Sequence, residues 1–152
     1  MKNIKLVITG MGAVTPVGIG VAEYWNALVK GQCGIDYITR FDTSDMPVKV
    51  AAEVKDFDPS VFMPKSLSRT MDLFSQFAYA AAEEAIKDSG LDINAESARI
   101  GIVMGSAMNG ISTIAETQTA LDSGKRVNPR FVPKSIGNIG AAQIAISHGI
   151  LG

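Results

Sequence analysis

Apolar and polar positions along this chain predict an α/β protein. Two short apolar runs rich in β-branched residues, residues 4–8 and 100–104, are typical of strands buried on both faces of a sheet. Elsewhere, apolar residues recur every three or four positions, which is the spacing of one face of a helix. This spacing predicts helices over residues 21–29, 66–89, 111–123 and 135–148, each closely followed by a helix-ending glycine.

Three further features complete the pattern. Residues 48–54 alternate weakly between apolar and polar, which predicts an edge strand or one arm of a hairpin. Asp58 followed by Pro59 is typical of a helix N-cap with proline at the first helical position, so a short helical turn is expected there. Residues 125–133 are predicted to form a loop. The many alanines of the helix over 66–89 favour close packing against another backbone.

The last predicted helix, residues 135–148, is apolar on almost every side. Such a helix has to be covered all round, and the few other predicted elements offer limited cover. The chain then ends at Gly152, where the pattern would next place a strand. We therefore expect an N-terminal part of something larger; the alternative is a short chain whose last helix is buried by a partner.

The turn over residues 105–110 follows the second predicted strand and precedes a helix. Ligands of open α/β sheets bind at the carboxyl ends of the strands, so this turn is where we expect a ligand to approach. Met108 places a flexible apolar side chain in the turn, where polar residues are usual. The alternative is a methionine that fills a gap in the core.

Composition narrows the class of protein. The 152 residues are 47% hydrophobic and 19% charged with a net charge of −1, which suits one globular domain and offers no electrostatic reason to expect a nucleic acid or a membrane surface as partner. No run approaches the roughly 20 apolar residues of a membrane span. A single cysteine fits a reducing compartment, so a cytoplasmic protein is expected. One Cys and one His exclude a conventional zinc site, and no cofactor is expected.

Several candidate motifs have a simpler reading. Gly10 and Gly12 follow the first strand as in a dinucleotide fingerprint, but Thr15 stands where its third glycine would fall, so a tight turn is favoured. Cys33 has no base near it in sequence and reads as an inert thiol. His148 ends a helix, where a cation interacts favourably with the helix dipole.

The charged residues of the long predicted helix allow two interpretations each. Glu83 and Glu84 are neighbours that point in different directions, which favours solvated surface over a paired acid and base. Lys65 and Arg69 lie at the helix start, where basic charge opposes the dipole. They indicate either an acidic partner or a solvated helix end. Ser106 does not lie in a nucleophile-elbow motif and is a weak nucleophile candidate.

A run of motifs in order along the chain resembles the N-terminal part of the β-ketoacyl-acyl-carrier-protein synthases, and the type II elongating synthases of fatty-acid synthesis most of all. The resemblance covers essentially the whole chain in register. The matching segments are residues 6–18, 31–35, 41–44, 54–57, 71–72, 99–101, 105–106 and 131–133.

This resemblance implies a thiolase-like fold, in which a layered mixed β-sheet is flanked by helices, and an incomplete half of it here. It implies an acyltransferase that performs a decarboxylative Claisen condensation of an acyl chain, held as a cysteine thioester, with malonyl-carrier protein, usually as a homodimer. The nucleophilic cysteine of such synthases follows the position matching Gly152, and two histidines and a lysine come later. Residues 1–152 would thus be a domain without catalytic residues, inactive alone.

The resemblance also assigns individual residues. Met108 matches an apolar residue at the floor of the acyl tunnel, and Phe131 and Ile136 match the loop and helix start that line this tunnel. Lys65 and Arg69 match a basic region that contacts the acidic acyl carrier protein. Thr70 departs from this pattern, because some relatives carry a second basic residue there.

Two alternatives remain open from the sequence. One is a catalytically dead partner subunit similar to a chain-length factor, in which another residue replaces the missing cysteine. The other is a dinucleotide-binding oxidoreductase domain built on Gly10 and Gly12.

Overall fold

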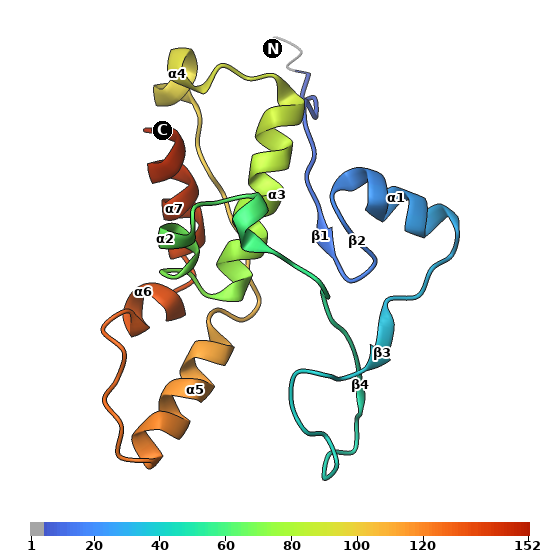
Figure 1. Ribbon diagram of the computed structural model, residues 1–152. Helices are drawn as coiled ribbons and strands as arrows, with labels where there is room; N and C mark the ends of the chain where they lie inside the picture. Colours follow the sequence, from blue (N-terminus) through green and yellow to red (C-terminus); the bar gives the residue numbers. More distant parts are fainter. Residues whose placement is uncertain (1–4) are drawn as a thin grey trace.

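The computed structural model describes residues 5–152, in which helices surround a central helix, α3, and the strands are short (Figure 1). The longer helices are α1 (Val21–Val29), α3 (Leu73–Ser89), α5 (Ile111–Asp122) and α7 (Ile139–His148). The shorter ones are α2 (Lys65–Ser68), α4 (Ile93–Glu96), α6 (Phe131–Ser135) and the 3₁₀ turns η1 (Pro59–Val61) and η2 (Ser97–Arg99). Two antiparallel hairpins pair β1 (Val14–Thr15) with β2 (Gly18–Ile19), and β3 (Ile35–Tyr37) with β4 (Val50–Ala52).

The core lies where α3 packs against α7 and the segment around α2. Tyr79 of α3 and Ile144 of α7 are buried there together with Met63 and Met71. Burying one such side chain stabilises the fold by about 1.5–3 kcal/mol, so this small cluster holds the two helices together. In Figure 1, α7 and α2 lie on one side of α3, and α1 with its hairpin lies on the other.

The N-terminal segment runs against the alanine-rich face of α3. A Cβ atom on Gly10 would lie 2.2 Å from the carbonyl oxygen of Ala85, and one on Gly12 would lie 1.8 Å from that of Ala81. Both distances are far below van der Waals contact, so only glycine fits. The expected close packing of this helix against another backbone is confirmed, and it accounts for both glycines.

The two predicted buried strands are wrong for the residues that the structure describes. Residues 5–8 form no strand, and Leu6 is 94% exposed; Ile4 lies outside the described residues. Residues 100–104 also form no strand, and Val103 is fully exposed. A strand needs a neighbour to which its backbone can donate and accept hydrogen bonds, and the described residues supply none on either side.

Several helix predictions are confirmed and others need correction. The helix over 21–29, the helix from 111, the turn at Pro59 and the hairpin arm within 48–54 all form. The helix predicted over 66–89 is two helices, because the Asp72 side chain accepts a hydrogen bond from the Phe74 N–H and starts a new helix. The helix predicted over 135–148 begins at Ile139, because Ile136 is extended. The loop predicted over 125–133 contains the start of α6.

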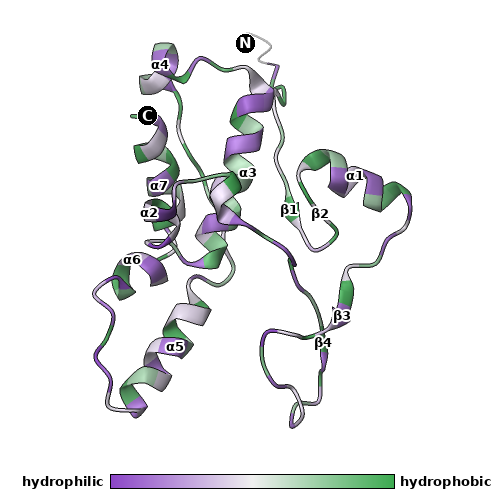
Figure 2. Ribbon diagram, viewed as in Figure 1, coloured by the Kyte–Doolittle hydropathy of each residue, from purple (hydrophilic) through white to green (hydrophobic). Residues whose placement is uncertain are grey.

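Helix α7 is covered on one side only by the described residues. Gly140 and Ile144 are buried, whereas Ile146 is 73% exposed. Figure 2 shows hydrophobic residues along much of this helix. The described chain therefore does not provide the all-round cover that its composition predicts. None of the helices within residues 5–152 is both long and apolar enough to cross a membrane.

Candidate functional site

The turn that carries Met108 connects the extended segment 100–104 to α5. The Ser106 hydroxyl donates a hydrogen bond to the Met108 carbonyl oxygen at 3.3 Å, and Gly110 has a φ of 53°, a conformation that favours glycine. The Met108 side chain is 65% exposed. It therefore does not fill a gap in the core of the described chain, and it is free to meet a ligand.

The same turn packs against the end of α6, where Ile136 lies. A Cβ atom on Gly110 would lie 2.5 Å from Cα of Ser135 and 2.7 Å from the Lys134 carbonyl oxygen. The two segments therefore touch at backbone distance. The structure brings the turn of Met108 and the segment of Ile136 together, as two walls of one apolar surface would require.

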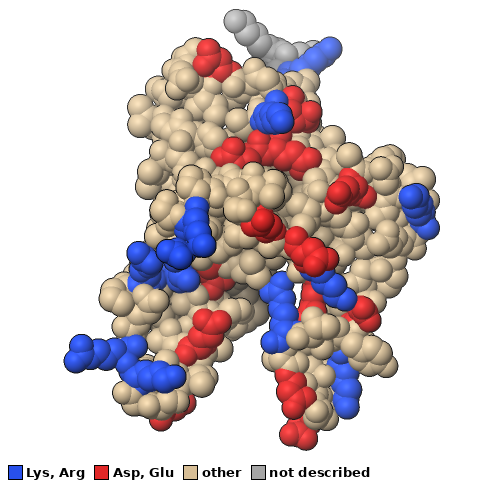
Figure 3. Space-filling model, in the orientation of Figure 1, with Lys and Arg blue, Asp and Glu red and all other residues tan. Residues whose placement is uncertain are grey.

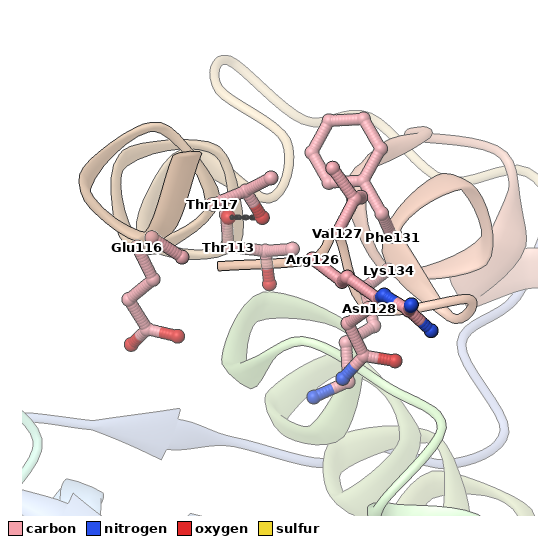
Figure 4. Close-up of a pocket in the computed structure, with 9 residues that line it drawn as sticks. Thr113, Glu116, Thr117, Arg126, Val127, Asn128, Phe131 and Lys134 are labelled. Atoms are coloured by element: carbon pink, nitrogen blue, oxygen red, sulfur yellow. Dashed lines mark hydrogen bonds between the residues drawn. The ribbon is translucent and has the colours of Figure 1, made fainter. Parts of the chain in front are cut away.

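Phe131 lies one helical turn earlier in α6 and lines a different hollow. This cavity, of about 180 Å³, lies between α5 and α6, and Met108 and Ile136 are not among its lining residues. In Figure 4, Phe131 lies beside Val127, and the α5 residue Thr117 faces the same space. The structure thus places two of the three predicted substrate residues on neighbouring segments and gives Phe131 separate surroundings.

Basic residues gather over α2, over α6 and around the turn between α5 and α6. Lys65 is the first residue of α2 and Arg69 caps its end, and both are exposed. The three ion pairs within the described residues involve other side chains, so neither cation is paired with a carboxylate there. Figure 3 shows Lys and Arg atoms over α2 and α6 and around the turn between α5 and α6. The basic residues of these latter two segments are Lys125, Arg126, Arg130 and Lys134.

Asp72 connects the basic segment to α5, a role that the sequence prediction missed. The residue is 7% exposed, and its carboxylate accepts hydrogen bonds from the N–H of Phe74 in α3 and from both the N–H and the hydroxyl of Thr113 in α5. One carboxylate therefore caps two helices. An Asp before an apolar run is a known start signal, but the continuous periodicity across Asp72 concealed it.

Glu83 and Glu84 are not the solvated pair that the sequence predicts. Glu84 accepts hydrogen bonds from the backbone N–H groups of Ala13, at 3.0 Å, and Val21, at 2.8 Å, so it caps α1 from another helix. Glu83 lies 2.8 Å from Nε2 of His148, an ion pair when the imidazole is protonated. The adjacent carboxylates therefore tie α3 to two different parts of the chain.

Tyr79 packs beside this pair. Its ring lies 6.3 Å from that of His148. Burial raises the pKa of the Tyr79 hydroxyl, and the hydrogen bond with Ser147 opposes this shift. Within residues 5–152, no three His, Cys, Asp or Glu side chains converge on a point where a metal ion could bind.

The chain is similar to known proteins over its whole length. Residues 4–152 match the family described as "Beta-ketoacyl synthase, N-terminal domain". Over its whole length the chain is 41% identical to 3-oxoacyl-[acyl-carrier-protein] synthase 2 of Coxiella burnetii, and over 99% of its length it is 44% identical to the synthase 2 of Staphylococcus aureus MRSA252. It spans 37% of the length of each of these relatives.

Solved structures show the same architecture. A β-ketoacyl synthase from Burkholderia phymatum aligns with 96% of this chain and 37% of its own, with a TM-score of 0.79 and 26% identity. The ishigamide ketosynthase/chain length factor aligns with 93% of this chain and 36% of its own, with a TM-score of 0.72 and 30% identity. Helices with small sheets, as seen here, are thus arranged as in ketosynthases.

Proposed function

Since this chain belongs to the β-ketoacyl synthase family, whose N-terminal domain it matches, we propose that it is the N-terminal portion of a type II elongating 3-oxoacyl-acyl-carrier-protein synthase. The complete enzyme would condense an acyl chain, held as a thioester, with malonyl-carrier protein in fatty-acid elongation. The observation that carries this proposal is identity of 41–44% with 3-oxoacyl-[acyl-carrier-protein] synthases 2 across essentially the entire chain. We further propose that this chain is an incomplete half of a thiolase-like fold and that the complete enzyme is a cytoplasmic homodimer.

The catalytic residues of such an enzyme would lie outside residues 1–152. Covalent condensation needs an activated thiolate and imidazole groups. Cys33 is exposed in the loop after α1, and His148, the one histidine of the chain, is engaged by Glu83. The nucleophile would therefore follow Gly152. Residues 1–152 alone are expected to give no condensation product with acyl- and malonyl-carrier protein.

The acyl chain would meet this domain at the surface formed by Met108 and Ile136, with Phe131 further along α6. The test is Met108→Phe in the complete synthase, with the chain lengths of the products measured. The phenyl ring is bulkier than the methionine side chain, so at the end of the acyl space it should shift the profile toward shorter products. Met46→Phe is the matched control, because Met46 is also exposed but lies in the hairpin loop. An unchanged profile in Met108→Phe would refute the assignment.

The acidic carrier protein would dock on the basic surface that includes Lys65 and Arg69. Reversing both charges, Lys65→Glu with Arg69→Glu, should raise KM for the carrier-bound acyl group several-fold and leave kcat nearly unchanged, because exposed charges act mainly on encounter. The effect should shrink at high salt. Lys30→Glu, at the exposed end of α1, is the control. Equal KM values for the two variants would contradict this docking site.

A catalytically dead partner subunit is the second candidate, because one structural neighbour is a ketosynthase/chain length factor. The coding sequence downstream of Gly152 separates the two. Cysteine at the end of the next strand supports the synthase, and another residue there supports the partner.

A further inference from the structure

The side-chain amide of Asn109 packs directly against the backbone of Gly137. A Cβ atom on Gly137 would lie 2.3 Å from Nδ2, 2.6 Å from Cγ and 2.8 Å from Oδ1 of Asn109. The whole terminal amide of Asn109 therefore occupies the space that any other residue at position 137 would need for its side chain. The two residues lie on the two segments that carry Met108 and Ile136.

Backbone conformation does not require glycine at position 137. The described glycines with positive φ are those at positions 20, 31, 90, 110, 124 and 149, and Gly137 is not among them. The three atoms nearest to a Cβ there all belong to the Asn109 amide, so a side chain at position 137 requires that amide to move. The residue at one of these positions therefore limits which residue fits at the other, although the two positions are 28 apart in the sequence.

Hydrogen bonding does not explain why asparagine lies there either. Its Oδ1 atom is buried and has no hydrogen-bond partner within the described residues. Leaving a buried acceptor unpaired is unfavourable. The contact of this amide that the structure shows is therefore its close approach to the backbone of Gly137.

We propose that Asn109 and Gly137 set the distance between the Met108 turn and the Ile136 segment, and thereby the acyl chain length that the complete synthase accepts. This rests on the proposed function, since it presumes that both segments line the acyl space. Gly110 against Ser135 forms the second contact of the same junction, so the turn is held at two adjacent points. Without the Asn109 side chain, only the Gly110 contact holds the turn, and the residues that precede Asn109 in the turn, Met108 included, shift.

The test uses three variants of the complete synthase: Asn109→Gly, Gly137→Ala and the double variant. The readout is the ratio of kcat/KM for a long and a short acyl-carrier substrate, together with the melting temperature. Asn109→Gly should change this ratio because the turn loses its contact with Gly137. Gly137→Ala should change it because the new Cβ displaces the amide. The double variant should return toward the wild-type ratio, with a coupling of about threefold or more, as residues in contact show.

Asn138→Gly is the matched control, because Asn138 is exposed, makes no side-chain cap to α7, and occupies a position that tolerates glycine. Rescue of the ratio in the double variant supports the proposal. Additive changes, or lower melting temperatures with an unchanged ratio, overturn it and reduce the pair to packing. A wild-type protein that makes no condensation product refutes the proposed function instead, so the two failures are distinct.

Discussion

Replacing Asp72 by alanine tests whether one carboxylate holds two helices in place. The substitution removes the acceptor of the Phe74 N–H at 3.4 Å and of the Thr113 N–H at 3.3 Å, together with the bond from the Thr113 hydroxyl. Loss of an N-cap costs about 0.5–2 kcal/mol. A hydrogen bond to a charged group contributes about 1.5–3 kcal/mol. Both N–H contacts are long, so we expect a loss of about 2–4 kcal/mol in the free energy of unfolding.

Urea-induced unfolding followed by circular dichroism measures this loss. Asp92→Ala is the matched control, because the exposed Asp92 caps only its own short helix by accepting a hydrogen bond from the Ala95 N–H at 3.1 Å. That variant should lose about 0.5–1 kcal/mol. Thr113→Val, combined with Asp72→Ala in a double-mutant cycle, isolates the contact between helices. Equal losses for the Asp72 and Asp92 variants would show that the carboxylate acts locally and would refute the reasoning.

Two further predictions concern α3. Gly12→Ala should destabilise the fold by about 2–3 kcal/mol in the same unfolding assay, because its Cβ would overlap the Ala81 carbonyl oxygen. Gly101→Ala is the control and should change stability by less than about 0.5 kcal/mol, because the nearest atoms to a Cβ there are 3.9 Å away; similar losses in both variants would contradict the close approach. Burial raises the pKa of the Tyr79 hydroxyl, so the stability gained from burying it is complete below the usual tyrosine pKa of about 10 and is lost as pH rises through the higher pKa of the folded state. Tyr79→Phe should therefore make the free energy of unfolding fall less steeply above about pH 10. An unchanged slope would contradict this prediction.

Where a helix or turn starts or ends because of residues close by in the sequence, the sequence alone determined that boundary. Helix α1 follows its apolar spacing and ends before Gly31, which has a φ of 65°. The turn at Pro59 forms because the Asp58 side chain accepts from the Ser60 N–H two residues away. The order of motifs also sufficed to indicate the family, which the match over residues 4–152 confirms. The roles of Met108, Phe131, Ile136, Lys65 and Arg69 stay predictions.

Only the tertiary structure decided the features that depend on atoms distant in sequence. Asp72 meets Thr113 across 41 positions and Glu84 meets Ala13 across 71, so no short-range pattern could reveal either cap. The glycine at position 137 has its reason in the Asn109 amide. Residues 5–8 and 100–104 have the composition of strands, yet composition supplies no hydrogen-bonding neighbour. The sequence by itself determined the ends of helices with local start and stop signals, such as α1. The tertiary structure decided which polar groups find partners, because a hydrogen bond or a steric overlap depends on distance in space.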